Sequence, residues 1–240
     1  MTDRMDLHTH TIASGHAYNT RNEMIAAAYG KGLEILAITE HAPAMPGSCQ
    51  HIYFSNYRVL PRLYEEMTVL YGAELNILDY AGSVDLPDDT LRKMDITLAS
   101  IHPNCYVSGT EKENTSAYLG AMKNPYINII AHPDDSRFPV DYETLVKAAK
   151  EYHVLLEVNN TSLSPASFRL GAHENYRKML ELCVKYQVPI IVDSDAHVDG
   201  LVGAHEFAMQ MLNDMGFPEE LVLNTDSEAI YGYINGIPEY

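Results

Sequence analysis

Short runs of apolar and β-branched residues recur along the chain and alternate with longer stretches of helical period. Parallel strands covered on both faces have this pattern, because neither face of the sheet meets water and each crossover needs a helix. Seven strands are predicted: Arg4–Leu7, Ile35–Thr39, Val69–Ala73, Ile96–Ser100, Ile127–Ala131, Val154–Val158 and Pro189–Val192.

The stretches between these strands predict the helices. Asp141 can cap one of them, and a glycine ends another. The predicted helices are Asn22–Gly30, Asp141–Glu151, His173–Tyr186, Gly203–Met215 and Asp226–Asn235. No linker or repeat divides the 240 residues. We therefore predict one α/β domain over residues 1–240, a distorted (β/α)7 TIM-like barrel, with an open doubly wound sheet as the alternative.

Charge and composition exclude several classes of protein. The formal net charge of -17 opposes binding to nucleic acid or to an anionic membrane, which depends on clustered Lys and Arg. The apolar runs are too short to span a bilayer, and the first eight residues do not resemble a signal peptide. Cys49, Cys105 and Cys183 have no paired spacing, which indicates free thiols. We expect a cytoplasmic protein that binds neither nucleic acid nor membrane.

Histidines and carboxylates that could bind a metal stand at or just after the C-terminal ends of the predicted strands, and six of the seven ends supply a predicted ligand. These ends share one rim in a β/α barrel, where the active sites of such folds lie. His8 and His10 are two residues apart on a strand, so both side chains point the same way and can chelate one ion. The predicted ligands are His8, His10, His16, His41, Glu74, His102, His132, Asp195 and His197.

Chance is the competing explanation for each histidine taken alone. A single histidine near a strand end is more often a hydrogen-bonded structural residue than a ligand. Seven histidines on one predicted rim are hard to obtain as independent accidents. The remaining four fall in loops or helices, and we predict that they bind no metal: His51, His153, His173 and His205.

The ligand types and their number indicate a catalytic cluster of ions. Imidazoles with a minority of carboxylates favour zinc, iron or manganese over calcium or magnesium. Three tetrahedral ions need about twelve ligand positions, of which seven histidines, Asp195 and a bridging Glu74 supply about ten. Positions left open for water or substrate are typical of a catalytic site.

Eight short motifs together carry a resemblance that covers nearly the whole chain. They are Asp-Leu-His-Thr-His-Thr (6–11), Ser-Gly-His-Ala-Tyr (14–18), Ala-Ile-Thr-Glu-His (37–41), Gly-Ala-Glu-Leu-Asn (72–76), Ile-His-Pro (101–103), Ala-His-Pro (131–133), Leu-Glu-Val-Asn-Asn-Thr-Ser (156–162) and Asp-Ser-Asp-Ala-His (193–197). In these motifs the chain resembles the polymerase and histidinol phosphatase (PHP) superfamily, specifically its YcdX-like bacterial phosphatases.

The resemblance implies a centre of three divalent ions per chain, with zinc as the metal and manganese or iron as alternatives. The three implied ligand sets are His8, His10, Glu74 and Asp195; Glu74, His102 and His132; and His16, His41 and His197. Glu40 stands where many relatives have Asp, and we expect it to support the ligands from behind. The resemblance also suggests a homotrimer.

This centre predicts a phosphatase that hydrolyses a small phosphomonoester with a metal-bound hydroxide. Three dications and two carboxylates leave a local charge of about +4, which attracts a phosphate dianion. No residue is identified as the acid that protonates the leaving group. Arg137, Arg169 and Asn159 are candidates for substrate contact, although a surface position is the commoner role of such arginines and Asn159 could simply satisfy the strand end.

Three other functions remain open at this point. A binuclear amidohydrolase, acting on C–N or C–O bonds, also begins with His-x-His but usually carries a bridging carboxylated lysine, and no lysine stands at a predicted strand end here. A nuclease would need a basic groove that the acidic composition does not suggest. A non-catalytic metal-binding protein would have no need of open coordination positions.

Overall fold

Seven parallel strands form the central sheet in the computed structural model, which describes residues 3–236. Neighbours in the sheet follow the order β1-β2-β4-β5-β6-β7-β8, and the short β3 pairs antiparallel with β4. The strands are β1 (Met5–Asp6), β2 (Ile35–His41), β3 (Leu63–Tyr64), β4 (Met67–Asn76), β5 (Ile96–Ser100), β6 (Ile129–Ile130), β7 (Leu155–Asn159) and β8 (Ile190–Asp193).

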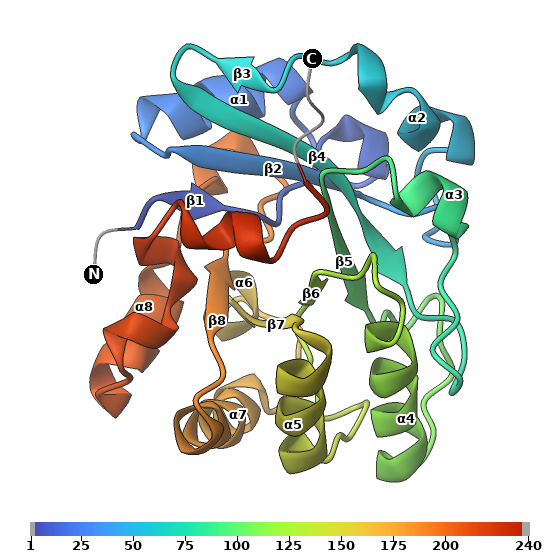
Figure 1. Ribbon diagram of the computed structural model, residues 1–240, viewed down its shortest axis with the longest axis vertical. Coiled ribbons are helices and arrows are strands. Elements are labelled where there is room, and N and C mark those ends of the chain that lie inside the picture. The colour runs from blue at the N-terminus through green and yellow to red at the C-terminus, as the bar shows by residue number, and fades with distance from the viewer. Residues whose placement is uncertain (1–2, 237–240) are drawn as a thin grey trace.

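The longer helices lie around the outside of these strands (Figure 1). The α-helices are α1 (Arg21–Gly30), α2 (His51–Ser55), α3 (Asp88–Leu91), α4 (Glu111–Met122), α5 (Tyr142–Tyr152), α6 (Asn160–Leu163), α7 (Ala172–Tyr186) and α8 (Glu206–Met215). Short 3₁₀ helices are Ile12–Ser14, Tyr57–Val59, Asp199–Leu201, Glu219–Leu221, Leu223–Thr225 and Ala229–Gly232. Within residues 3–236, no helix has the length and apolar character needed to cross a membrane.

The sheet closes on itself through a thin seam between β1 and β8. Thr9 pairs with Ala196 in a single parallel bridge, and the His10 amide donates to the Ala196 carbonyl at 2.9 Å. Beside this bridge, the amide of Leu7 donates to Asp193 Oδ1 at 2.7 Å. A hydrogen bond to a side chain thus takes the place of a backbone hydrogen bond between β1 and β8. The predicted distorted barrel of a single α/β domain is confirmed, and the doubly wound alternative is wrong.

Apolar side chains pack on both sides of the strands. All seven residues of β2 are buried, and its alternate positions belong to two different clusters. The smaller cluster includes Met5, Ile35 and Leu98, and the larger one joins the opposite face of the strands to the helices. This two-sided burial explains why the strands read as continuous apolar runs in the sequence.

The helix starts and ends agree with their local chemistry. Thr20 and Thr110 each form a capping box with a glutamate three residues on, and Asp141 accepts from the first amides of α5 as predicted. The sequence analysis missed α4, although its capping box is a recognisable signal. Gly203 has a positive φ of 64°, so α8 begins at Glu206.

The predicted helix Asp226–Asn235 is wrong. Only a short 3₁₀ helix, Ala229–Gly232, forms there. The carboxylate of Asp226 accepts from the amides of Glu228 and Ala229, as an N-cap does. The helix does not continue, because the Tyr233 carbonyl accepts from the Asn128 side chain and the Asn235 amide donates to the Asp95 carbonyl. The strands also differ from prediction in length: β2 and β4 extend further, so that His41 and Glu74 lie within strands.

His205 links the end of the barrel seam to the N-terminus of β1. Its ring is 3% exposed, Nδ1 pairs with Asp3, and Nε2 lies 3.7 Å from Asp6 Oδ1. Asp6 in turn accepts from the amides of Ser194 and Gly203. Burial lowers the pKa of His205, but Asp3 and Asp6 outweigh it and raise the pKa to about 10. The histidine is therefore a structural cation.

Replacing His205 by glutamine should remove one pH-dependent contribution to stability. Between the unfolded pKa of about 6.5 and the folded pKa of about 10, the native state holds a proton that the unfolded chain has lost. This contribution is complete below pH 6.5 and disappears as the pH rises through 10. The wild-type advantage over His205→Gln, on the order of 3–5 kcal/mol at low pH, should therefore shrink on going from pH 7 to pH 10.5. Urea unfolding of both proteins at equal metal loading measures this difference in the free energy of unfolding. A difference that does not change with pH would contradict the assignment of His205 as a buried cation.

Candidate metal centre

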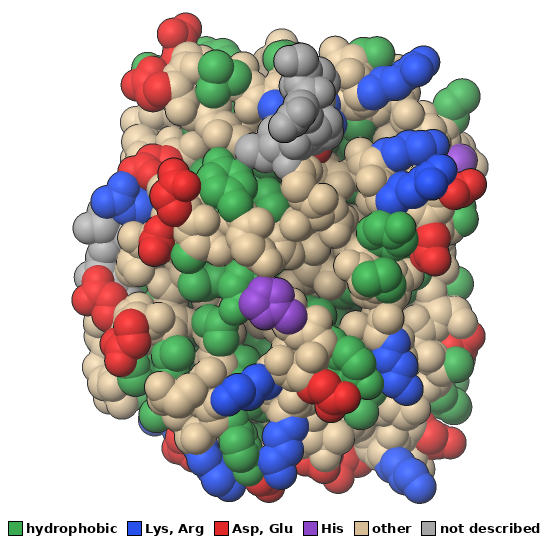
Figure 2. Space-filling model, viewed as in Figure 1, with side chains coloured by type: hydrophobic (Ala, Val, Ile, Leu, Met, Phe, Trp, Pro, Cys, Tyr) green, Lys and Arg blue, Asp and Glu red, His purple; other side chains and the backbone are tan. Residues whose placement is uncertain are grey.

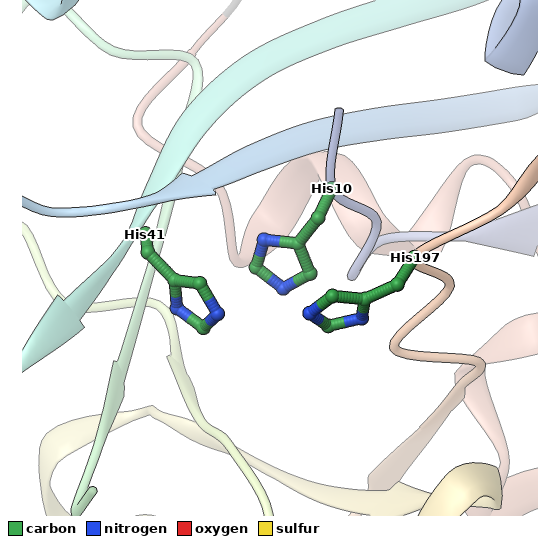
Figure 3. Close-up of side chains that lie close together, drawn as sticks. All are labelled: His10, His41 and His197. Carbon is green, nitrogen blue, oxygen red and sulfur yellow. The ribbon is translucent and has the colours of Figure 1, made fainter. Parts of the chain in front are cut away.

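The nine predicted ligands meet at the C-terminal ends of the parallel strands. Seven of them are buried, His197 is partly exposed, and His16 is exposed, so the cluster has a dry floor and one open side. Figure 3 shows three of these rings, from the segments after β1 and β8 and from the end of β2, turned toward one another. These are His10, His41 and His197.

Strand register explains why two of the ligands are neighbours. His41 ends β2 and pairs directly with Glu74 of β4, so their side chains leave the sheet at the same level. The Nδ1 atom of His41 lies 2.6 Å from Glu74 Oε2.

A glycine turn precedes the ligand His16. Gly15 has a positive φ of 84° and ends the 3₁₀ helix Ile12–Ser14. A Cβ on Gly15 would lie 2.2 Å from the carbonyl oxygen of Gly47, so no larger residue fits there.

His8 and His10 form the deepest group with two carboxylates. Their Nε2 atoms lie 3.1 Å apart. Glu74 Oε2 lies 3.4 Å from Nε2 of His8 and 3.5 Å from that of His10. Asp195 Oδ1 lies 3.6 Å and 3.3 Å from the same two atoms. These five separations of 3.1–3.6 Å among four donor atoms suit ligands of one tetrahedral ion.

The second carboxylate oxygen of Glu74 faces another pair of rings. Its Oε1 atom lies 2.7 Å from His132 Nε2 and 3.2 Å from His102 Nε2. Asn76 Oδ1 lies 2.9 Å from the Nδ1 of His102 and orients that ring. Glu74 therefore presents one oxygen to each of two groups of imidazoles, which is the arrangement of a bridging ligand.

A third group of rings lies at the open side of the cluster. His41 Nε2 lies 3.2 Å from His16 Nε2. The ring centroid of His197 lies 4.9 Å from that of His16 and 5.8 Å from that of His41. His10 borders this group as well, with its centroid 4.5 Å from that of His197.

Glu157 supports two of the ligands from behind. Its Oε1 lies 2.6 Å from His8 Nδ1, and its Oε2 accepts from the backbone amide of His132 at 2.7 Å. A carboxylate on the far nitrogen fixes the ring orientation of a metal-binding histidine and directs its Nε2 toward the ion. Glu157 stands at the end of a predicted strand but was not among the predicted ligands, and its supporting role was not predicted.

Glu40 supports the other side of the cluster through a hydroxyl group. It accepts from the Ser14 hydroxyl at 2.5 Å, and that hydroxyl lies 3.1 Å from His10 Nδ1. The amide of His41 also donates to the Ser14 oxygen, at 3.0 Å. Glu40 thus lies behind the ligands, where the sequence analysis expected it.

Burial and neighbouring charges shift the pKa values of four ligand histidines, three of them downward and one upward. Burial and the neighbouring rings of His41 and His197 hold the pKa of His10 well below its usual value. Burial likewise lowers the pKa values of His16 and His102. These imidazoles are therefore neutral at pH 7 and offer a lone pair, which ligation requires.

His8 behaves in the opposite way because carboxylates surround it. Burial lowers its pKa, but Glu157, Asp195 and Glu74 outweigh that effect and raise the pKa well above its usual value. Burial raises the pKa values of Glu74 and Asp195, but the surrounding histidines outweigh it and hold them well below their usual range. Both carboxylates are thus ionised, and their buried negative charge needs cations nearby to balance it.

Unpaired buried atoms in the cluster fit metal ions. Among residues 3–236, His41 Nδ1, Glu74 Oε2 and Asp195 Oδ1 are fully buried and make no hydrogen bond, although the first two lie 2.6 Å apart. Buried polar atoms are rarely left without a partner unless they bind an ion or water. The donor atoms form four overlapping sets of three, and within each set the atoms lie within 4.8 Å of one another. Together these sets include eight of the nine predicted ligands. The residues present fit a multinuclear centre.

The three predicted substrate contacts lie at different depths. Arg169 is buried, with Nη1 2.8 Å from His132 Nδ1 and Nη2 3.7 Å from Asp195 Oδ2. Asn159 lies below the ligands, where its amide donates to Asp195 Oδ2 at 3.2 Å. Arg137 forms a salt bridge with Asp135 at 2.5 Å and stacks on Phe168. Of the three, Arg169 lines the cavity over the cluster and Arg137 does not.

Comparison with known proteins settles the family. The PHP domain model matches residues 6–205. The chain belongs to the PHP family. It is 43% identical over 230 residues to a protein of Clostridium novyi and 44% identical over 231 residues to one of Thermoanaerobacter sp., both named probable phosphatases. Each alignment covers 96% of this chain, and 93% and 94% of the relatives respectively. The predicted enzyme class, a phosphoric ester hydrolase, is confirmed by the family and these relatives.

Solved structures share the fold at low sequence identity. Histidinol phosphate phosphatase from Lactococcus lactis, crystallised with zinc, L-histidinol and phosphate, superposes with a TM-score of 0.65 at 16% identity. The alignment covers 90% of this chain and 95% of that one. A chain of an archaeal ribonuclease P complex aligns with a TM-score of 0.52 at 15% identity, over 98% and 97% of the two chains. At these identities the likeness concerns the fold alone.

Replacing Glu157 by glutamine should weaken metal binding without removing a ligand. The neutral amide no longer favours the tautomer of His8 that directs Nε2 toward the ion, and such changes typically cost about 10- to 100-fold in metal affinity. Competition with a chromophoric chelator measures the affinity, and circular dichroism reports the fold. The exposed Glu181 provides a matched Glu181→Gln control with wild-type affinity. Equal affinities for all three proteins would contradict the supporting role.

Proposed function

We propose that this chain is a phosphomonoesterase with three divalent ions at the described cluster. One ion is held by His8, His10, Glu74 and Asp195, a second by Glu74, His102 and His132, and the third by His16, His41 and His197. The observation that carries the proposal is the carboxylate of Glu74, whose two oxygens face different groups of imidazoles at 2.7–3.5 Å. Zinc suits these donors, and manganese and iron are the alternatives.

When bound, the ions activate a water molecule and neutralise the oxygens of the phosphoryl group. In the hydrolysis, an oxygen–phosphorus bond forms from water and the ester P–O bond breaks. The products are inorganic phosphate and an alcohol, with one water proton passing to the leaving oxygen. The chain itself holds the cluster rigid through Glu157 and Glu40 and excludes water from its floor, which is fully buried around His8 and Glu74.

Arg169 places a positively charged side chain beside the cluster. Its side chain is 8% exposed and lines the cavity, so its charge acts in a poorly screened environment. It can donate to His132 Nδ1 only while the ring proton is on Nε2. If His132 bound an ion through Nε2, its ring proton would lie on Nδ1, and the guanidinium would be free to contact a phosphate group. A planar guanidinium matches two oxygens of a phosphate group.

The alternative functions receive no specific support. Of the two carboxylates in the cluster, Glu74 occupies the position between imidazole groups, where an amidohydrolase usually places a modified lysine. Basic side chains on the face in Figure 2 are interspersed with acidic and hydrophobic ones. A cytoplasmic location and a homotrimer stay predictions from the sequence and from the resemblance.

Turnover of a substrate panel tests the proposed activity. The purified holoenzyme should release inorganic phosphate from small phosphomonoesters, lose this activity with a chelator and regain it with zinc or manganese. Lactones, amides and single-stranded DNA in the same panel represent the amidohydrolase and nuclease alternatives. Preferred hydrolysis of one of these, with no release of phosphate from any monoester, would overturn the proposal.

Replacing Arg169 by alanine should weaken phosphate binding and leave the metal content unchanged. Loss of a charge-assisted contact costs about 1.5–3 kcal/mol, so KM for a monoester and Ki for inorganic phosphate should rise at least tenfold. Arg177→Ala, at an exposed position of α7, is the matched control. If Ki for phosphate stays at the wild-type value while metal content is normal, Arg169 does not bind the phosphoryl group.

A further inference from the structure

A cavity of about 610 Å³ opens over the metal centre and is the space into which the substrate's alcohol must fit. Five of the ligands form its floor, among them His41 and His197 in Figure 3. The walls come from the segments that follow β2, β5, β7 and β8. The wall residues are Met45, Pro46, Pro103, Asn104, Thr161, Ser167, Phe168, Arg169 and Leu201.

Charge in this cavity lies on the floor and on one wall residue, Arg169. Of the described residues in its walls, Arg169 alone is ionised, and its guanidinium faces the ligands His132 and Asp195. The nearby Arg137 lies outside the lining, and its charge is matched by Asp135. A second anionic group on a substrate would therefore find no cation in the described walls except Arg169, which faces the ligands, and an ammonium group would find no carboxylate there. Burying either without a partner is costly.

The walls offer few polar side chains to a ligand, and those of Thr161 and Ser167 already make a hydrogen bond within the protein. The Thr161 hydroxyl donates to the carbonyl of Ser194 at 2.7 Å, and the Ser167 hydroxyl accepts from the amide of Arg169 at 3.1 Å. Asn104 contributes a polar side chain, which lies 4.0 Å from the sulfur of Met45. A polyol chain, which needs many hydrogen bonds, is thus poorly matched to this surface.

Apolar side chains, in contrast, are available to a ligand. Phe168 is 65% exposed and Leu201 is 45% exposed, and both line the cavity directly beside the cluster. Arg169 and Arg137 lie over the Phe168 ring, at 5.4 Å and 5.6 Å from its centroid, and hold it in place. Covering such surfaces with an apolar group is favourable in proportion to the area removed from water.

We propose that the preferred substrate is the phosphate monoester of an uncharged, predominantly apolar alcohol, with its ring or branched chain packed against Phe168, Leu201 and Met45. This inference rests on the proposed phosphomonoesterase function and adds the identity of the leaving group. The phosphoryl group lies on the floor beside Arg169, and the alcohol carbon chain meets the uncharged part of the walls.

Four substrates with alkoxide leaving groups test this inference on the holoenzyme. They are benzyl phosphate, phosphoethanolamine, 3-phosphoglycerate and glycerol 3-phosphate, which are respectively apolar, cationic, anionic and polyhydroxy. We expect kcat/KM for benzyl phosphate to exceed each of the others by at least about tenfold, as apolar pocket contacts typically discriminate. A higher kcat/KM for one of the three polar esters overturns the inference and leaves the proposed function standing. No turnover of any ester overturns both.

Substitutions in the cavity walls test where the alcohol part of the substrate binds. Phe168→Ala and Leu201→Ala should each lower kcat/KM for benzyl phosphate about tenfold, mainly through KM, while Ki for inorganic phosphate and the metal content stay at wild-type values. Leu170→Ala is the matched control, because Leu170 is 58% exposed nearby and does not line the cavity. Wild-type kinetics in both wall variants would overturn the placement of the alcohol.

Discussion

The buried carboxylate of Glu74 is the contact on which the rest of the site depends. It is ionised, fully buried and surrounded by imidazoles from four separate segments of the chain. A charge removed from water needs a partner, and mutual attraction to imidazole protons or metal ions supplies it. Since the partners come from β2, β5, β6 and the segment after β1, the charge also ties the strand ends together. The site and the rim of the barrel are in this sense one structure.

A second layer of side chains makes this arrangement specific. Glu157 and Glu40 hold ligand rings through the nitrogen that faces away from the centre or through a hydroxyl group. Asp6, Asp193 and His205 secure the seam where β1 meets β8, the two elements that lead into four of the nine ligands. The thin hydrogen bonding of that seam is therefore compensated by buried ionic contacts directly below the centre. Loss of these contacts would affect the ligand positions through the backbone.

The sequence predicted the barrel and the location of the ligand set because both follow from strand periodicity. Strand ends in a parallel barrel face one rim, so position along the chain was enough to bring nine residues together. It was not enough to predict the supporting role of Glu157, because that role depends on which ligand rings its carboxylate reaches in the folded chain. The surroundings of Arg169 and Phe168 depend on the loop after β7, whose path has no periodic signal. The wrong helix at 226–235 has a related origin, since Tyr233 and Asn235 bond to Asn128 and Asp95, which are distant in the sequence, and the helix does not continue.

The metal content of the purified chain tests the central claim most directly. The protein would be prepared without added metal or chelator, and plasma mass spectrometry would give the ions per chain. Our account predicts close to three transition-metal ions, and about two in a His16→Ala, His197→Ala double variant that lacks two ligands of the outermost site. A wild-type chain that holds essentially no metal, even after reconstitution with zinc, manganese and iron, would contradict it.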